Sequence, residues 1–191
     1  DATVWGGTSP CPDSCTSLLF DGTTSNYAMV SSFADFPSSE VSAEFWMKSS
    51  DTSSEGTVFD YHSGSYGRDN DFNLFNYNSF TMGIGGMWAD FGGVSATDGS
   101  WHHIVATWES SSGNAILYKD GVEVGSANES AGLSVISGGT LLLGQEQDIQ
   151  GGDFQSHQAA LGHVTGVRLY DGVLTPAQVA DRYLHQDVTG I

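Results

Sequence analysis

The stretch with the clearest chemical content is GQEQDIQGGDFQSHQ, residues 144–158. Its two carboxylates, Glu146 and Asp148, stand one residue apart and are followed by a glycine pair and several amides. If a strand runs that far, residues i and i+2 face the same side, so both acids would project together. A pair of this kind can serve as the acid and base of a hydrolase or as oxygen ligands of a hard cation.

Hydrolysis of a glycoside requires a second carboxylate at the right distance. A common group of retaining β-glucanases carries E-x-D-x-E on a sandwich strand, with the outer two acids about 5–5.5 Å apart as nucleophile and acid/base. Here the third acid is replaced by Gln150. Because an amide can neither attack an anomeric carbon nor transfer a proton, we predict no catalytic residues and rank a glycoside hydrolase third.

Calcium suits the same residues better, because it takes six to eight oxygens from carboxylates, amides and carbonyls at about 2.3–2.6 Å. The glycines at 151 and 152 would let the chain fold back and bring the amides of 155–158 toward the same ions. The residues themselves leave a simpler alternative open. In that alternative, an acidic strand end and a Gly-rich loop merely face solvent.

The composition limits the partners. Five basic and 23 acidic residues give a net charge of −18, which repels nucleic acid and anionic membrane surfaces and attracts cations. Mean hydropathy is −0.17 and no apolar run approaches 18 residues, so we predict no membrane insertion. The 191 residues are expected to form a single domain over 1–191, because no Pro-rich or low-complexity linker divides them.

Short runs rich in Val, Ile, Phe, Tyr and Trp alternate with clusters of Gly, Ser, Asn and Asp, as in an all-β antiparallel sandwich. The predicted strands are 17–22, 27–32, 41–49, 56–62, 71–77, 79–84, 102–110, 114–121, 140–147 and 162–172. Asp120-Gly121 predicts a tight hairpin turn. One C-terminal helix is predicted from Thr175 as cap and Pro176 as first residue. Its proposed packing face is Val179, Ala180, Tyr183 and Leu184.

The N-terminal segment 1–16 contains Cys11 and Cys15, the two cysteines of the chain. Their spacing allows a small disulfide loop, whereas a zinc site would need further ligands. Asn128 begins an Asn-Glu-Ser glycosylation sequon. The first residues resemble a mature start after signal removal. Together these features predict a secreted, extracellular protein.

Two longer stretches resemble the pentraxin members of the laminin-G and concanavalin-like jelly rolls. The first, SWHHIVATWESSSGNAILYKDG, is similar to the family signature, and the second, LLLGQEQDIQGGDFQSHQAALGHVTGVRLYDGVLTPAQV, to its calcium loop and following helix. Together they cover about 90 residues in the family's order. The resemblance implies a two-sheet jelly roll with one or two bound calcium ions and a possible homo-oligomer.

The resemblance also implies which residues hold the metal. The first ion would bind Asp69, Asn70, Glu146, Asp148 and the main-chain carbonyl of Gln147; the second would share Glu146 and Asp148 and add Gln155 and Gln158. The family usually has glutamate at the position of Gln155. Fewer anionic ligands should weaken calcium binding, so the second ion is the less secure expectation.

Beside the second ion the family has an aromatic ligand pocket, to which Phe75 and Thr81 correspond by resemblance. No carboxylate occurs between Thr81 and Trp88, so the acid that receives a choline cation in the best-known pentraxins has no counterpart there. The leading hypothesis is a calcium-binding, lectin-like module that recognises a glycan or other oxygen-rich ligand. The alternative is an extracellular structural subunit that assembles into rings or filaments with calcium as a structural ion.

Overall fold

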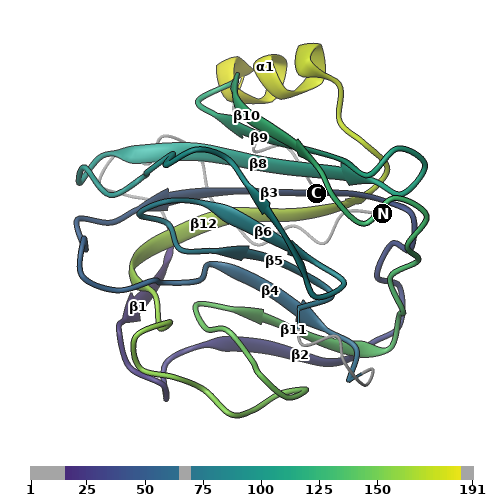
Figure 1. The fold of residues 1–191 in the computed structure, drawn as a ribbon. Coiled ribbons are helices and arrows are strands. Elements are labelled where there is room, and N and C mark those ends of the chain that lie inside the picture. Colours follow the sequence, from purple (N-terminus) through teal and green to yellow (C-terminus); the bar gives the residue numbers. More distant parts are fainter. Residues whose placement is uncertain (1–15, 65–69, 186–191) are drawn as a thin grey trace.

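Two six-stranded antiparallel sheets pack face to face in the structure, a computed structural model that describes residues 16–64 and 70–185 (Figure 1). The first sheet contains, in spatial order, β1 (Leu18–Asp21), β12 (Leu161–Asp171), β3 (Glu40–Lys48), β8 (Trp101–Glu109), β9 (Asn114–Lys119) and β10 (Val122–Asn128). The second contains β2 (Ala28–Phe33), β11 (Gly139–Leu143), β4 (Phe59–His62), β5 (Phe72–Phe75), β6 (Thr81–Ile84) and β7 (Met87–Asp90). The predicted all-β sandwich with one C-terminal helix is confirmed.

Alternation along β4 shows how the sheets meet. Tyr61 points into the space between them and stacks on Phe36 with 3.7 Å between ring centroids, and Phe59 is wholly buried in the same core. Asp60 and His62 therefore face the outer side of the second sheet. Both are nevertheless buried, because the connection from β11 to β12 covers this part of the sheet.

Several strand boundaries differ from the prediction, and β7 and β10 are not among the predicted ranges. The strand expected over 140–147 ends at Leu143, because Gly144 adopts a φ of +88° and a side chain there would collide with the ring of Phe20. The unpredicted strand β7 follows the two positive-φ residues Gly85 and Gly86, which make a tight turn after β6. The predicted hairpin turn at Asp120-Gly121 is confirmed, since both residues have positive φ.

Helix α1 (Pro176–His185) begins with a reciprocal cap. Thr175 Oγ1 accepts a hydrogen bond from the Gln178 N–H at 3.3 Å, and Gln178 Oε1 accepts one from the Thr175 N–H at 2.8 Å. Val179 is wholly buried, whereas Leu184 is 71% exposed, so the prediction that Leu184 shares the packing face is wrong. The ring of Tyr183 instead stacks on Trp46 of β3. Within the described residues, no helix has the length and apolar character needed to cross a bilayer.

Beneath α1, the buried carboxylate of Glu44 joins β3 to three other elements. It contacts His103 Nε2 of β8 at 3.1 Å, Arg168 Nη1 and Tyr170 Oη of β12 at 2.9 and 2.6 Å, and Arg182 Nη1 of α1 at 3.4 Å. Burial acts to raise the pKa of Glu44. The hydrogen bonds from His103 and Tyr170 and the charge of Arg168 outweigh it, so the pKa is lowered.

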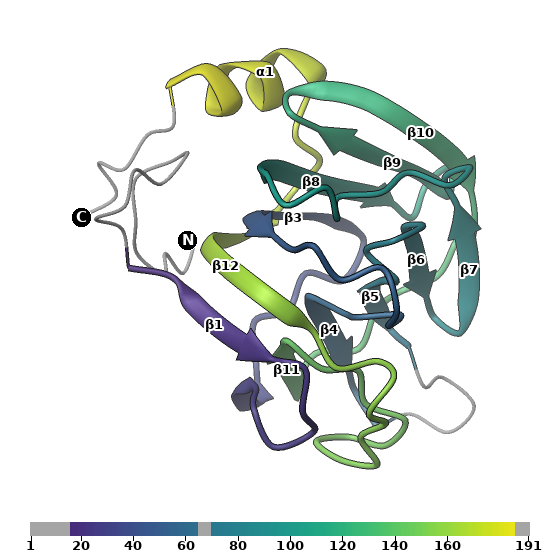
Figure 2. The same ribbon diagram turned by 90° about the vertical axis from the view of Figure 1, so that its left-hand side faces the viewer.

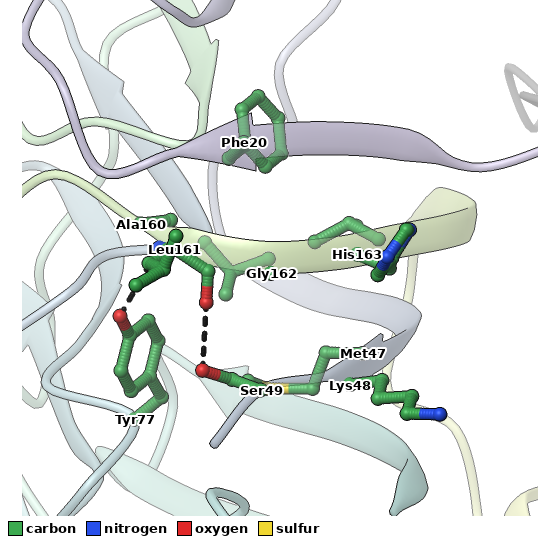
Figure 3. Close-up of a pocket in the computed structure, with 11 residues that line it drawn as sticks. Phe20, Met47, Lys48, Ser49, Tyr77, Ala160, Leu161, Gly162 and His163 are labelled. Atoms are coloured by element: carbon green, nitrogen blue, oxygen red, sulfur yellow. Dashed lines mark hydrogen bonds between the residues drawn. The ribbon is translucent and has the colours of Figure 1, made fainter. Parts of the chain in front are cut away.

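A small pocket lies between β1, β3 and β12 (Figure 3). Its volume of about 10 Å³ is about what one water molecule needs, so a sugar does not fit. At its edge the Tyr77 hydroxyl accepts a hydrogen bond from the Leu161 N–H at 3.1 Å and donates one to Asp51 at 2.8 Å. Ser49 Oγ donates to the Leu161 carbonyl at 2.7 Å. The start of β12 is thus fixed by buried polar groups.

Replacing Tyr77 by phenylalanine is expected to lower the free energy of unfolding by about 1–3 kcal/mol, because the Leu161 N–H and the buried Asp51 would each lose a partner. Urea denaturation would measure the change. Tyr27→Phe is the matched control, because Tyr27 is 38% exposed and its ring contact with Phe154 persists in phenylalanine. Equal stability of the two variants would contradict the assigned role of Tyr77.

Candidate metal centre

A row of residues crosses the outer face of the second sheet, one from each strand. Cross-strand pairing links them in the order Met29, Leu142, Asp60, Asn73, Gly83 and Trp88. Two residues beyond Asp60 on β4, His62 Nδ1 lies 3.3 Å from Asp71 Oδ2, which also accepts the Ser63 N–H at 2.6 Å. The middle of this face therefore carries two buried acids, Asp60 and Asp71.

Gln147 fastens the β11–β12 connection onto that face. Its N–H donates to Asp60 Oδ2 at 3.0 Å, and its side chain donates to the Thr140 carbonyl at 3.0 Å and accepts the Gly151 N–H at 2.7 Å. The connection, light green in Figure 2, passes beside β4 and β11. The hydrogen bond between Asp60 and Gln147 joins residues 87 positions apart in the sequence. This hydrogen bond places the loop that follows β11 against β4.

The carboxylates that flank Gln147 have different surroundings. Glu146 is buried, and its charge acts on Asp60. Asp148 is half-buried and accepts a hydrogen bond from Gln155 Nε2 at 2.5 Å. Because β11 ends at Leu143, the condition under which strand alternation would align the two acids is not met. The anchored loop positions them instead.

Two of the other expected ligands, Asn70 and Gln158, are buried. Asn70 is buried, and its Oδ1 accepts a hydrogen bond from Asn73 Nδ2 at 2.5 Å. Gln158 is 9% exposed at the far end of the loop. Asp69 lies outside the described residues.

The site is electrostatically unfavourable without a cation. Burial, followed by the charge of Glu146, raises the pKa of Asp60 well above its usual value of 3.8, although hydrogen bonding from Gln147 opposes this. Among the buried oxygens that have no hydrogen-bond partner within the described residues are Asp60 Oδ1, Asp71 Oδ1 and Gln158 Oε1. Such oxygens are costly to bury. They are also the donors that a hard cation prefers, so the residues present fit calcium.

In residues 16–64 and 70–185, no three His, Cys, Asp or Glu side chains lie close enough together to form a preformed metal site. Amide and main-chain oxygens would therefore have to complete the coordination of an ion. Calcium accepts such ligands, whereas zinc takes nitrogen and sulfur ligands in most structural sites.

The expected ligand pocket lies on the outer face of β5–β7. Phe75 and Thr81 are directly paired across β5 and β6. The ring of Phe75 lies 5.4 Å from that of Trp88, which is 43% exposed. Asp90 of β7 pairs with Thr81 on its other side, and its Oδ1 accepts the Gly92 N–H at 2.8 Å. A carboxylate is thus present on this face, two residues beyond the 81–88 segment that contains none.

Asp60 and Asp90 are the acids that the sequence analysis missed. The signal for Asp60 was available, because alternation in FDYH places it opposite to Phe59 and Tyr61 and hence away from the core. The signal for Asp90 was weaker, since β7 is short and was not predicted. What covers Asp60 could not be inferred from local pattern at all.

The remaining predicted sites lie elsewhere. Asn128 is exposed at the end of β10, so its glycosylation stays a prediction. Cys11 and Cys15 lie outside the described residues, and so does their expected disulfide.

The fold is that of a pentraxin-type jelly roll. A solved structure, the native heptameric SAP-like pentraxin from Limulus polyphemus, matches 95% of this chain and 80% of its own with a TM-score of 0.68 at 20% identity. A sequence model of the Pentaxin family matches residues 19–190. The chain therefore belongs to the pentraxin family.

Curated relatives agree with this assignment. Mouse "Sushi, von Willebrand factor type A, EGF and pentraxin domain-containing protein 1" is 38% identical over 140 residues, which are 73% of this chain and 4% of that protein. Human neuronal pentraxin-1 is 37% identical over 137 residues, 70% of this chain and 31% of that protein. The chain thus spans less than a third of the length of these two relatives.

Proposed function

We propose that the chain is an extracellular, calcium-binding recognition module that binds a glycan or another oxygen-rich ligand at the outer face of its second sheet. The observation that carries the proposal is the buried Asp60, whose Oδ2 accepts the N–H of Gln147 between Glu146 and Asp148 and whose Oδ1 has no hydrogen-bond partner in the described residues. Pentraxins usually bind calcium and are generally binding proteins rather than enzymes.

The proposed first ion is held by Asp69, Asn70, Glu146, Asp148 and the Gln147 carbonyl, and the second by Glu146, Asp148, Gln155 and Gln158. Bound calcium would supply an open coordination position for a phosphate, carboxylate or sugar oxygen. Gln155 now points an N–H toward Asp148, so its amide would have to turn to offer an oxygen. The second ion is therefore expected to bind more weakly than the first.

The function is tested on a glycan array with the whole chain, in calcium and in chelator. Calcium-dependent binding that Asp148→Ala abolishes would support the proposal. Asp181→Asn on α1 is the control, because it removes the same charge far along the chain from the loop. No bound ligand in either condition would refute the recognition part of the proposal.

A second candidate function is a self-assembling extracellular subunit with calcium as a structural ion. Exposed apolar residues on the edge strands β1 and β2 favour it: Leu18, Leu19, Met29 and Val30 are 38–60% exposed. Sedimentation velocity with and without chelator separates the two candidates. Calcium-dependent assembly without glycan binding would favour the subunit.

A further inference from the structure

Asp60 is a buried acid of the metal centre that the expected ligand set does not contain. We propose that Asp60 is a positioning residue of the calcium site, which holds the Gln147 segment in place and supplies buried negative charge for a bound cation to neutralise. This inference rests on the proposed calcium binding and concerns how the same site is built.

The positioning role follows from where Asp60 is fixed. It sits on β4, between β11 and β5, and is paired to both. Its Oδ2 accepts the N–H of Gln147, the residue between Glu146 and Asp148. Because both proposed bridging acids are adjacent to Gln147, movement of Gln147 would displace them together. Asp60 thus ties the loop that carries the ligands to the rigid sheet below.

The charge role follows from what Asp60 lacks. Its side chain is 0% exposed, and its Oδ1 has no hydrogen-bond partner among the described residues. Glu44 shows how the same protein satisfies a buried carboxylate internally, with a histidine, a tyrosine and two arginines around it. No such group surrounds Asp60 in the contacts of the described residues, so a cation is the partner that its charge fits.

This extra acid also explains how the site tolerates an amide at 155. Calcium affinity rises with the number of anionic groups and with the rigidity of the site. Relative to the glutamate usual in the family, Gln155 lacks one negative charge. Asp60 supplies an additional acid next to Glu146. Substitutions at residues 60 and 155 are therefore both expected to change the affinity for calcium.

The test uses Asp60→Asn and Asp60→Ala in the whole chain, with calcium affinity from calorimetry and melting temperature in chelator and in calcium. Asparagine keeps an oxygen for the Gln147 N–H but removes the charge. We expect Asp60→Asn to weaken calcium binding about tenfold or more, as happens in other metal sites when a residue that supports the metal ligands is lost. The calcium-induced rise in its melting temperature should be smaller than in wild type, because weaker binding stabilises the folded protein less. Asp60→Ala should weaken calcium binding further.

Glu44→Gln is the matched control, because it removes a buried carboxylate from the other sheet. It should lower the melting temperature in both conditions and leave the calcium-induced shift as in wild type. If Asp60→Asn binds calcium as tightly as wild type, the inference is overturned while the proposed function stands. If wild type itself binds no calcium, the proposed function fails and this inference with it.

Discussion

Replacement of Glu146 by glutamine is expected to weaken calcium binding by at least about 100-fold. Loss of a residue that only hydrogen-bonds to a metal ligand already lowers metal affinity about 10–100-fold. Glu146 is proposed to bind both ions directly. Glutamine keeps the size and one oxygen of the side chain, so the change isolates the charge. The buried position of Glu146 beside Asp60 strengthens the effect, because water screens charges poorly there.

Calorimetric titration measures this change in calcium affinity. Gln155→Glu is a second variant, which is expected to increase the affinity. Wild type is expected to show one tighter and one weaker calcium event. Glu146→Gln should weaken both, whereas Gln155→Glu should tighten the weaker one. Two equal events that neither variant alters would contradict the assignment of both residues.

Replacement of Glu44 by glutamine is expected to lower the free energy of unfolding by about 3–5 kcal/mol, because removal of one member of a buried ionic cluster leaves the others uncompensated. The cluster binds β3 to β8, β12 and α1, so hydrogen exchange in α1 should accelerate more than in the central strands. Urea denaturation gives the change in free energy, and exchange of the amides in 176–185 gives its location.

The contribution of Glu44 should depend on pH in one direction. Its pKa is lowered in the folded protein from an ordinary value of 4.5, so the unfolded chain takes up a proton first as the pH falls. The stabilisation is therefore fully present above about pH 4.5 and decreases below it. The difference between wild type and Glu44→Gln should shrink in acid.

Glu40→Gln is the control for Glu44, because it is on the same strand but exposed. It should change stability by less than about 0.5 kcal/mol at any pH. Equal losses in the two variants, or a difference for Glu44→Gln that grows in acid, would refute the assigned cluster.

Much of the architecture can be predicted from the sequence, because the relevant signals are local. Alternation of apolar and polar residues marks ten of the strands, Asp120-Gly121 has the chemistry of a tight turn, and Thr175 with Gln178 forms the expected cap. Each of these depends on residues a few positions apart, whose backbone preferences act before any tertiary contact forms.

The candidate site is predicted only in part for the same reason. The pattern around Glu146 and Asp148 indicates calcium, but the strand expected over 140–147 ends at Leu143. A side chain at the Gly144 turn would collide with the ring of Phe20, a residue more than a hundred positions away. Local pattern carries no information about such a neighbour.

By itself, the sequence determined that this chain is an acidic, all-β sandwich of the pentraxin type with an oxygen-rich loop after its penultimate strand. Only the tertiary structure decided that this loop covers Asp60, that Asp90 lies across from Thr81, and that Glu44 collects partners from three elements. The physical reason is that strand order and loop coverage are set by burial of the whole core. A charge therefore acquires its neighbours only when distant strands come together.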